Sequence, residues 1–279
     1  MPEDSDKYPT ESGRRRFVKG VVGSATLASV GTGAAAAVGS ATSATGAGGG
    51  LTQFFAIENT DGPAPRGMPL IPIEVQGGEL VGLFPDNIED GVAQMQIAGQ
   101  TYSSAWFQYC GVQTYAGVQP GTDQDNTFRA ASGAPYAWME DIEAGTPLTV
   151  DMFSDYEEWS NGIGRGGMGK PAMASWRSQD VSPQETLVAQ VLRSERIQEL
   201  REDPPEGANG DFIRAVTTED GFIAWLNKCT HFCCVPGFKS IAGSAAFGAE
   251  DRVYCQCHQS VYNPFSIVQG QFVALPRPE

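Results

Sequence analysis

Two short stretches decide how this chain is interpreted: C-T-H-F-C-C at residues 229–234 and C-Q-C-H-Q-S at residues 255–260. Together they contain both histidines of the 279-residue chain and five of its six cysteines. Each stretch brings thiol and imidazole groups together within a few residues, which is the pattern of a metal-binding loop. The two stretches therefore predict one metal centre that is built from two loops.

The mixture of residue types within each stretch indicates which metal centre this is. A [2Fe-2S] cluster with two cysteines on one iron and two histidines on the other takes two ligands from each of two loops. Because neutral imidazoles replace charged thiolates, its potential lies at about −150 to +300 mV, against about −400 mV for all-cysteine plant-type clusters. The competing interpretation is a Cys2His2 zinc site, in which a cysteine pair is usually followed by a histidine pair. We therefore favour the iron-sulfur cluster, since a purely structural disulfide role would leave the histidines unexplained.

The two stretches resemble the C-T-H-x-G-C-V-P and C-x-C-H-x-S boxes of Rieske proteins from cytochrome bc-type complexes. Residues 141–151 and the region from Gly169 to Arg177 also look like the base-domain strands of that family, so the resemblance covers about residues 138–279. It implies a mainly β protein with the Rieske fold. In this fold an antiparallel β base domain carries a small β cluster-binding subdomain, here at about residues 226–275.

The resemblance also implies a role for six of the residues in the two boxes. One iron would be bound by two cysteines and the other by two histidines, and one further cysteine of each box would join a disulfide. Such a bridge is compatible with a location outside the cytoplasm, where disulfides persist. The implied ligands are Cys229 and Cys255 for the first iron and His231 and His258 for the second, and the implied disulfide is Cys234 with Cys257.

Two hydroxyl groups and two departures from the family pattern refine this expectation. Ser260 and Tyr262 match positions whose hydroxyl groups hydrogen-bond to the cluster or to cysteine sulfur, which stabilises the reduced state and implies a high potential. The chain has Cys233 and Gln259 where the family has glycine, so we expect these two loops to be rearranged.

Cys110 and Cys233 are left over once the other four cysteines are assigned. A second disulfide between them is one interpretation, because an exported protein rarely keeps an unpaired thiol. In the other, Cys110 is a small buried hydrophobe within an aromatic core and Cys233 merely replaces a glycine. The sequence favours the second interpretation.

The N-terminal region looks like a twin-arginine export signal. The basic sequence S-G-R-R-R-F-V-K within residues 1–19 is followed by a hydrophobic leader or membrane anchor at residues 20–43 and a glycine-rich hinge at residues 44–52. Rieske subunits commonly keep this helix as an anchor. We therefore expect a membrane-anchored protein at the outer face of the cytoplasmic membrane.

The remaining chain is expected to be rich in short strands. Residues 53–137 alternate apolar runs with turn clusters and are predicted to form an additional β-rich segment of unknown role. Residues 182–202 are predicted to form one helix because a capping-box pattern precedes an apolar face. A hairpin is predicted from residues 212–216 and 222–226. Five aromatic residues around Cys110 are expected to pack in the core: Tyr102, Trp106, Phe107, Tyr109 and Tyr115.

The charge of the chain restricts its partners. The net charge of −15 excludes nucleic acid as an expected partner, because phosphate binding relies on clustered lysine and arginine. The acidic surface fits a halophilic source, since the Debye length is only ~3 Å at 1 M salt. It equally fits a basic redox partner.

The resemblance implies a respiratory-chain redox subunit that takes electrons from quinol. The exposed imidazole of His258 would be the catalytic group that accepts a hydrogen bond and a proton from quinol, while the cluster takes one electron. The expected partners are a cytochrome b subunit and a cytochrome c or blue-copper acceptor. The alternative is a small Rieske subunit of another exported oxidoreductase, such as an arsenite-oxidase-like enzyme. A Rieske oxygenase is excluded, because its mononuclear iron needs two further histidines and the chain has only two in all.

Overall fold

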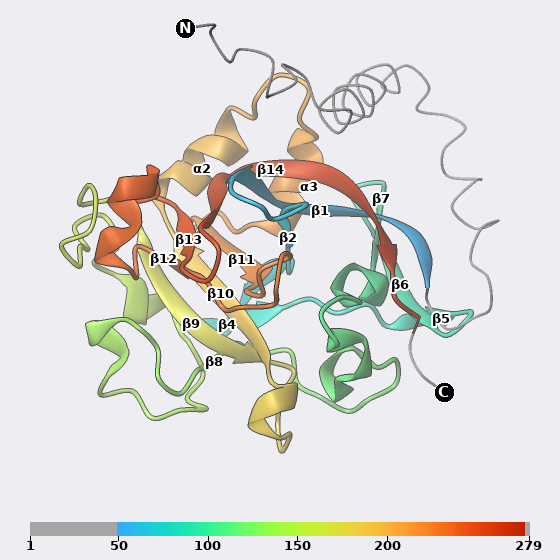
Figure 1. Ribbon diagram of the computed structural model, residues 1–279. Helices are drawn as coiled ribbons and strands as arrows, with labels where there is room; N and C mark the ends of the chain where they lie inside the picture. The colour runs from blue at the N-terminus through green and yellow to red at the C-terminus, as the bar shows by residue number, and fades with distance from the viewer. Residues whose placement is uncertain (1–48, 277–279) are drawn as a thin grey trace, which may run out of the picture. The chain divides into compact units, whose positions relative to one another are not determined.

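The two longest strands of the computed structural model, β1 (Gly50–Asp61) and β14 (Ser260–Ala274), pair antiparallel along most of their length. They run side by side as one curved ribbon (Figure 1). Their sheet has the strand order β12-β13-β14-β1-β2. Its short strands are β2 (Met68–Pro69), β12 (Gly237–Phe238) and β13 (Val253–Cys255). Strand β1 of the N-terminal half is therefore a direct neighbour of the strand that follows the second cysteine-histidine box.

The structure describes residues 49–276. The predicted export signal at residues 1–19, the leader or anchor at residues 20–43 and most of the predicted hinge lie outside the described residues. Within the described range, none of the helices has the length and apolar character that a membrane crossing requires.

A second antiparallel sheet has the order β11-β10-β9-β8. Its central strands are almost completely buried, which explains why apolar residues lie on both faces of each strand rather than alternating with polar ones. The strands are β8 (Arg129–Ala130), β9 (Lys170–Trp176), β10 (Leu187–Arg193) and β11 (Phe222–Leu226). Strand β11 leads directly into the first cysteine-histidine box, so this sheet fixes where that loop begins.

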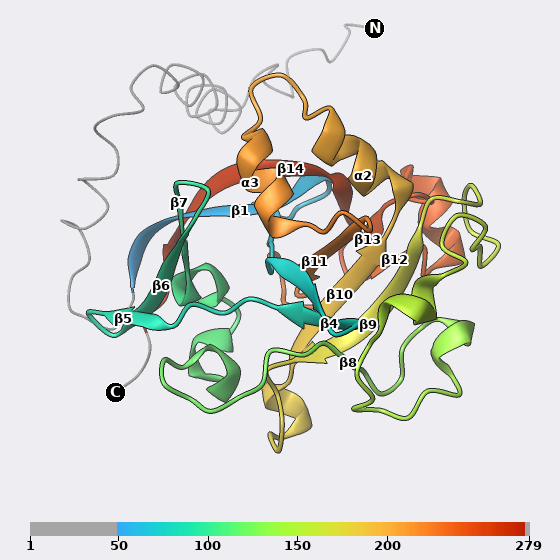
Figure 2. The same ribbon diagram turned by 180° about the vertical axis from the view of Figure 1, so that it is seen from behind.

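The other elements are short, and the protein is mainly β, as predicted. Strands β5 to β7 lie beside the C-terminal end of β14, and the helices α2 and α3 lie together at one side of the β1–β14 ribbon (Figure 2). The small antiparallel sheets are formed by β3 (Ile73–Gln76) with β4 (Glu79–Gly82), and by β5 (Asn87–Glu89), β6 (Val92–Ile97) and β7 (Gln100–Ser103). The 3-10 helices are η1 (Ser104–Phe107), η2 (Val112–Thr114), η3 (Ala116–Val118), η4 (Ala137–Met139), η5 (Val150–Phe153), η6 (Pro183–Glu185) and η7 (Ala242–Phe247).

The predicted single helix over residues 182–202 is wrong in its first half. The capping-box signal forms only the short turn η6, and β10 follows as a central strand of the second sheet. Its apolar residues fit one face of a helix, but they fit a strand that is buried on both faces equally well. The helix α2 (Glu195–Glu202) begins later, where the hydroxyl of Ser194 accepts a hydrogen bond from the backbone N–H of Arg196 at 3.2 Å.

The predicted hairpin is also wrong in its first strand. Residues 210–216 form the helix α3 (Gly210–Val216), and only β11 is a strand. The side chain of Asn209 accepts a hydrogen bond from the backbone N–H of Phe212 at 3.0 Å and so caps the helix. The buried side of α3 carries Phe212 and Ile213. Apolar residues at these positions are equally compatible with a strand, so the sequence did not distinguish the two.

The aromatic residues around Cys110 pack in the core, as predicted. Tyr102, Trp106, Phe107 and Tyr109 are buried, and only Tyr115 is half-buried. The ring of Tyr102 meets Trp106 edge-on, with their centroids 5.0 Å apart. These rings fix the position of the loop that carries Cys110.

Candidate metal centre

The first cysteine-histidine loop, residues 229–234, lies between β11 and β12 and closes on itself. The backbone N–H of Cys229 donates to the carbonyl of Cys234 at 2.7 Å, and the N–H of Cys233 donates to the carbonyl of Cys229 at 2.9 Å. These bonds hold Cys229 at the buried base of the loop while His231 remains half-buried nearer its tip.

The second loop is the tight connection between β13 and β14. Cys255 and Ser260 pair across its base, and the N–H of Gln259 donates to the carbonyl of Cys255 at 2.9 Å. Cys255 is buried, whereas Cys257 and His258 are exposed at the tip. The two loops are thus alike, each with one buried cysteine at its base and a histidine toward the surface.

Both glycine replacements keep a glycine-like backbone, so the expected rearrangement does not occur at these positions. Cys233 has φ +65° and Gln259 has φ +64°, in the left-handed region that glycine usually occupies. Such a conformation costs a non-glycine residue roughly 1–2 kcal/mol. The surrounding contacts must therefore hold each loop in this shape.

A disulfide joins Cys234 of the first loop to Cys257 of the second, with their Cα atoms 6.7 Å apart. This is the pairing that the resemblance implied. With the two loops joined in this way, the rings of His231 and His258 lie close together. Their centroids are 4.7 Å apart and the rings are nearly perpendicular. Four of the predicted site residues thus meet at one surface of the molecule.

The two remaining cysteines of these loops, Cys229 and Cys255, are free and buried. A hydrogen bond from the thiol of Cys255 lowers the pKa of Cys229, and a second bond from the hydroxyl of Tyr262 acts in the same direction against burial. The pKa of Cys255 is raised by the same shared hydrogen bond. These contacts favour the thiolate form of Cys229, the form of cysteine that binds metal ions.

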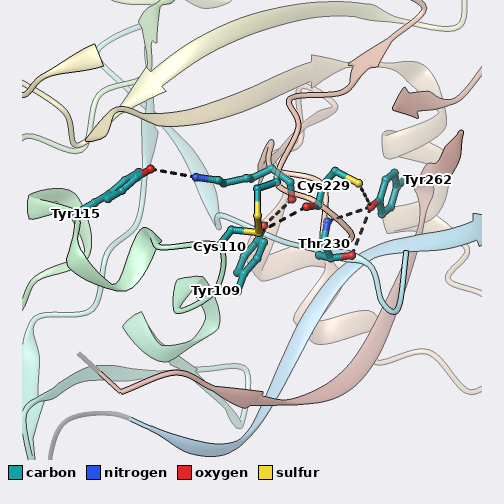
Figure 3. Close-up of a disulfide and its surroundings, with 8 residues drawn as sticks. Tyr109, Cys110, Tyr115, Cys229, Thr230 and Tyr262 are labelled. Carbon is teal, nitrogen blue, oxygen red and sulfur yellow. Dashed lines mark hydrogen bonds between the residues drawn. A yellow bond between two sulfur atoms is a disulfide. The ribbon is translucent and has the colours of Figure 1, made fainter. Parts of the chain in front are cut away.

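Tyr262 on β14 lies where its hydroxyl reaches the first loop. The hydroxyl lies 3.1 Å from Sγ of Cys229 and accepts a hydrogen bond from the N–H of Thr230 at 3.3 Å (Figure 3). Burial raises the pKa of Tyr262, so its hydroxyl stays protonated and donates to the thiolate. Ser260 is also buried, and its side chain lowers the pKa of Cys229 in the same direction as Tyr262 does.

A third loop that the sequence reasoning missed, G-P-A-P-R at residues 62–66, contacts both cysteine-histidine loops. A Cβ atom on Gly62 would lie 2.4 Å from the carbonyl oxygen of Gln259, so only glycine allows this approach. The hydroxyl of Thr230 donates to the carbonyl of Arg66 at 2.6 Å. Nothing in the sequence placed this segment beside the two cysteine-histidine loops.

A second disulfide joins Cys110 to Cys233, with their Cα atoms 5.6 Å apart (Figure 3). The favoured interpretation of two separate cysteines is therefore wrong. The bridge fixes residues of the aromatic segment against the first loop, and a hydrogen bond from the hydroxyl of Tyr109 to the carbonyl of Lys228 at 2.8 Å supports it. The ammonium of Lys228 donates in turn to the hydroxyl of Tyr115 at 3.1 Å. The additional β-rich segment thus supports the loop that carries two of the predicted ligands.

Comparisons with protein-family models, with curated proteins and with solved structures find no match to this chain. The geometry of the two loops and the residues that they carry must therefore support any functional assignment.

Proposed function

We propose that this chain is an electron-transfer subunit that binds a Rieske-type [2Fe-2S] cluster between its two cysteine-histidine loops. The main support for this proposal is that the thiol and imidazole groups occupy different parts of the paired loops. The two free thiols are buried at the loop bases, and the two imidazole rings lie together nearer the surface. Cys229 and Cys255 would hold the inner iron, and His231 and His258 would hold the outer iron.

An unpaired polar atom supports a cofactor at this position. Nδ1 of His231 is buried and has no hydrogen-bond partner among residues 49–276. Buried polar atoms are nearly always hydrogen-bonded, so this atom indicates a group that binds there. An iron on His231 would satisfy it.

The spacing of the donor atoms favours two irons over a single zinc ion. Four donors around one zinc lie within ~4.6 Å of one another, since each bond is at most about 2.3 Å long. Within the described chain, one group of three possible ligands has its donor atoms this close together, within 4.8 Å of one another. It consists of Cys234, Cys255 and Cys257. Two of these sulfur atoms form a disulfide and cannot bind a metal as thiolates. The four proposed ligands are thus spread over more space than one ion fills.

The exposed residues of the two loops fit a quinol donor. The side chain of Phe232 is 64% exposed beside His231 and His258, with its ring centroid 4.3 Å from the first ring and 5.0 Å from the second. It offers an apolar contact for a quinol ring. His258 accepts a hydrogen bond from the quinol hydroxyl at the ring nitrogen that does not bind iron, and then holds its proton. A bound cluster would supply the site for one electron, and a cytochrome c or blue-copper protein would be its acceptor.

Purification of the full-length chain from its own membranes tests this function. We propose that the chain lies at the outer face of the membrane and assembles with a cytochrome b subunit. An affinity-tagged chain in mild detergent is then expected to co-purify with b-type haem and with quinol-dependent reduction of cytochrome c. Co-purification with a large molybdenum-containing subunit and no haem b would overturn the proposal in favour of the alternative exported oxidoreductase.

We predict that Tyr262→Phe and Ser260→Ala each lower the midpoint potential of the cluster without removing iron, and that the double variant lowers it further. Each change deletes a hydroxyl donor that favours the more negative reduced state. Redox titration followed by EPR measures the shift.

Tyr254→Phe is the matched control, because Tyr254 lies on the adjacent strand β13 and stacks on Phe247 with ring centroids 5.4 Å apart. Its potential is expected to equal that of the wild type. An unchanged potential in the double variant would reject the proposed roles of Tyr262 and Ser260.

A further inference from the structure

Arg66, the last residue of the third loop, carries a positive charge that has no acidic partner among the described residues. Its guanidinium carbon lies 3.7 Å from the ring centroid of Phe272, 4.6 Å from that of Tyr109 and 4.9 Å from that of Phe54. Its Nη1 is buried and makes no hydrogen bond within residues 49–276. Three aromatic rings therefore surround this cation in place of a carboxylate.

Such an environment is costly for a cation. Removing a charge from water without an ion pair is unfavourable, and contacts with aromatic faces recover only part of the loss. Burial lowers the pKa of Arg66, although a guanidinium remains protonated in proteins. A half-buried cation whose Nη1 has no hydrogen-bond partner among residues 49–276 would be stabilised by a nearby negative group that these residues do not supply.

A short series of polar contacts connects the backbone of Arg66 with the sulfur of Cys229, a proposed iron ligand. The carbonyl of Arg66 accepts a hydrogen bond from the hydroxyl of Thr230 at 2.6 Å. The hydroxyl of Tyr262 contacts both the backbone N–H of Thr230, at 3.3 Å, and Sγ of Cys229, at 3.1 Å. Tyr109, whose ring lies against the guanidinium, donates to the carbonyl of the residue just before Cys229. Arg66 and its neighbour Tyr109 thus contact the first cysteine-histidine loop and the residue just before it.

We propose that Arg66 is an electrostatic determinant of the reduction potential: its half-buried positive charge stabilises the reduced form of the cluster. This inference rests on the proposed function. Reduction adds one electron to the cluster and makes it more negative, while the charge of Arg66 does not change. Because a low-dielectric surrounding strengthens the attraction between the two, Arg66 favours the reduced form and raises the potential.

Redox titrations of full-length variants, followed by the EPR signal of the reduced cluster, test this role. Arg66→Met removes the charge and keeps an apolar chain between the rings. It is expected to lower the equilibrium constant for reduction by about tenfold, which is 59 mV for a one-electron couple. Arg66→Lys keeps a positive charge and is expected to restore most of the wild-type potential, which a purely structural role of the side chain would not require.

Arg193→Met is the matched control. The guanidinium of Arg193 also lies over aromatic rings, 4.3 Å from the centroid of Tyr156 and 5.3 Å from that of Phe222. It stands opposite Phe222, at the end of β10 that is remote from the first loop. Loss of this cation is expected to leave the midpoint potential unchanged.

The outcomes separate this inference from the proposed function. A wild-type protein without the cluster signal would remove the proposed function itself. A full signal with the wild-type potential in Arg66→Met would overturn the role of Arg66 alone, and so would an equal loss of potential in Arg66→Lys and Arg66→Met. If Arg66→Met does not fold, Arg66→Gln is measured with the same expected shift, and a wild-type potential in that variant would also overturn the role.

Discussion

His258→Ala is expected to eliminate the EPR signal of the reduced [2Fe-2S] cluster, and His231→Ala is expected to do the same. The chain has only these two histidines, so no other imidazole can replace either ligand. The disulfide between Cys234 and Cys257 and the paired strands β13 and β14 do not depend on the histidines, so both variants should still fold. EPR of the dithionite-reduced proteins, together with iron analysis, measures the effect.

Phe232→Ala provides the matched control for both histidine variants. The phenylalanine ring lies beside both imidazole rings, but it cannot bind a metal ion. Its removal is expected to leave a full-strength signal. A full-strength signal from His258→Ala would instead show that the ligand assignment is wrong.

Removing the disulfide between Cys110 and Cys233 is expected to cause the largest loss of stability. The bridge spans 123 residues, against 23 for the bridge between Cys234 and Cys257. Loop-closure entropy predicts a stabilisation of roughly 4.7 kcal/mol for a loop of about 100 residues. The Cys110→Ala/Cys233→Ala variant should therefore lose about 4–5 kcal/mol of unfolding free energy in urea denaturation followed by tryptophan fluorescence.

The backbone of Cys233 provides an internal check on that loss. Because Cys233 has φ +65°, the Cys110→Ala/Cys233→Gly variant should recover roughly 1 kcal/mol relative to the alanine variant. Mass spectrometry of the unreduced wild type should first show one linked peptide pair that contains Cys110 and Cys233. Alkyl groups on both cysteines, or equal urea midpoints for the wild type and the alanine variant, would contradict the bridge.

The candidate ligands could be predicted from the sequence because their information is local. Cys229 and His231 occur within three residues, and the mixture of thiol and imidazole in both loops restricts the chemistry to a few metal centres. The bridge between Cys110 and Cys233 could not be predicted in this way. A disulfide requires Cα atoms about 4.4–6.8 Å apart, and only the folded aromatic segment brings these two cysteines together.

The errors in the secondary structure have a similar origin. Residues 187–193 have apolar residues at positions that suit both a helix and a buried strand, and pairing with β9 and β11 decides for the strand. The position of the loop at residues 62–66 could not be predicted either. Its contact with Gln259 and Thr230 depends on the long pairing of β1 with β14, which joins residues about 200 positions apart in the sequence.

The most direct test of the central claim is the metal and sulfide content of the full-length protein, purified anaerobically, together with its EPR spectrum after reduction. The account predicts two irons and two acid-labile sulfides per chain, with the spectrum of a cluster that has nitrogen ligands on one iron. One zinc per chain, with no labile sulfide and no EPR signal, would contradict it.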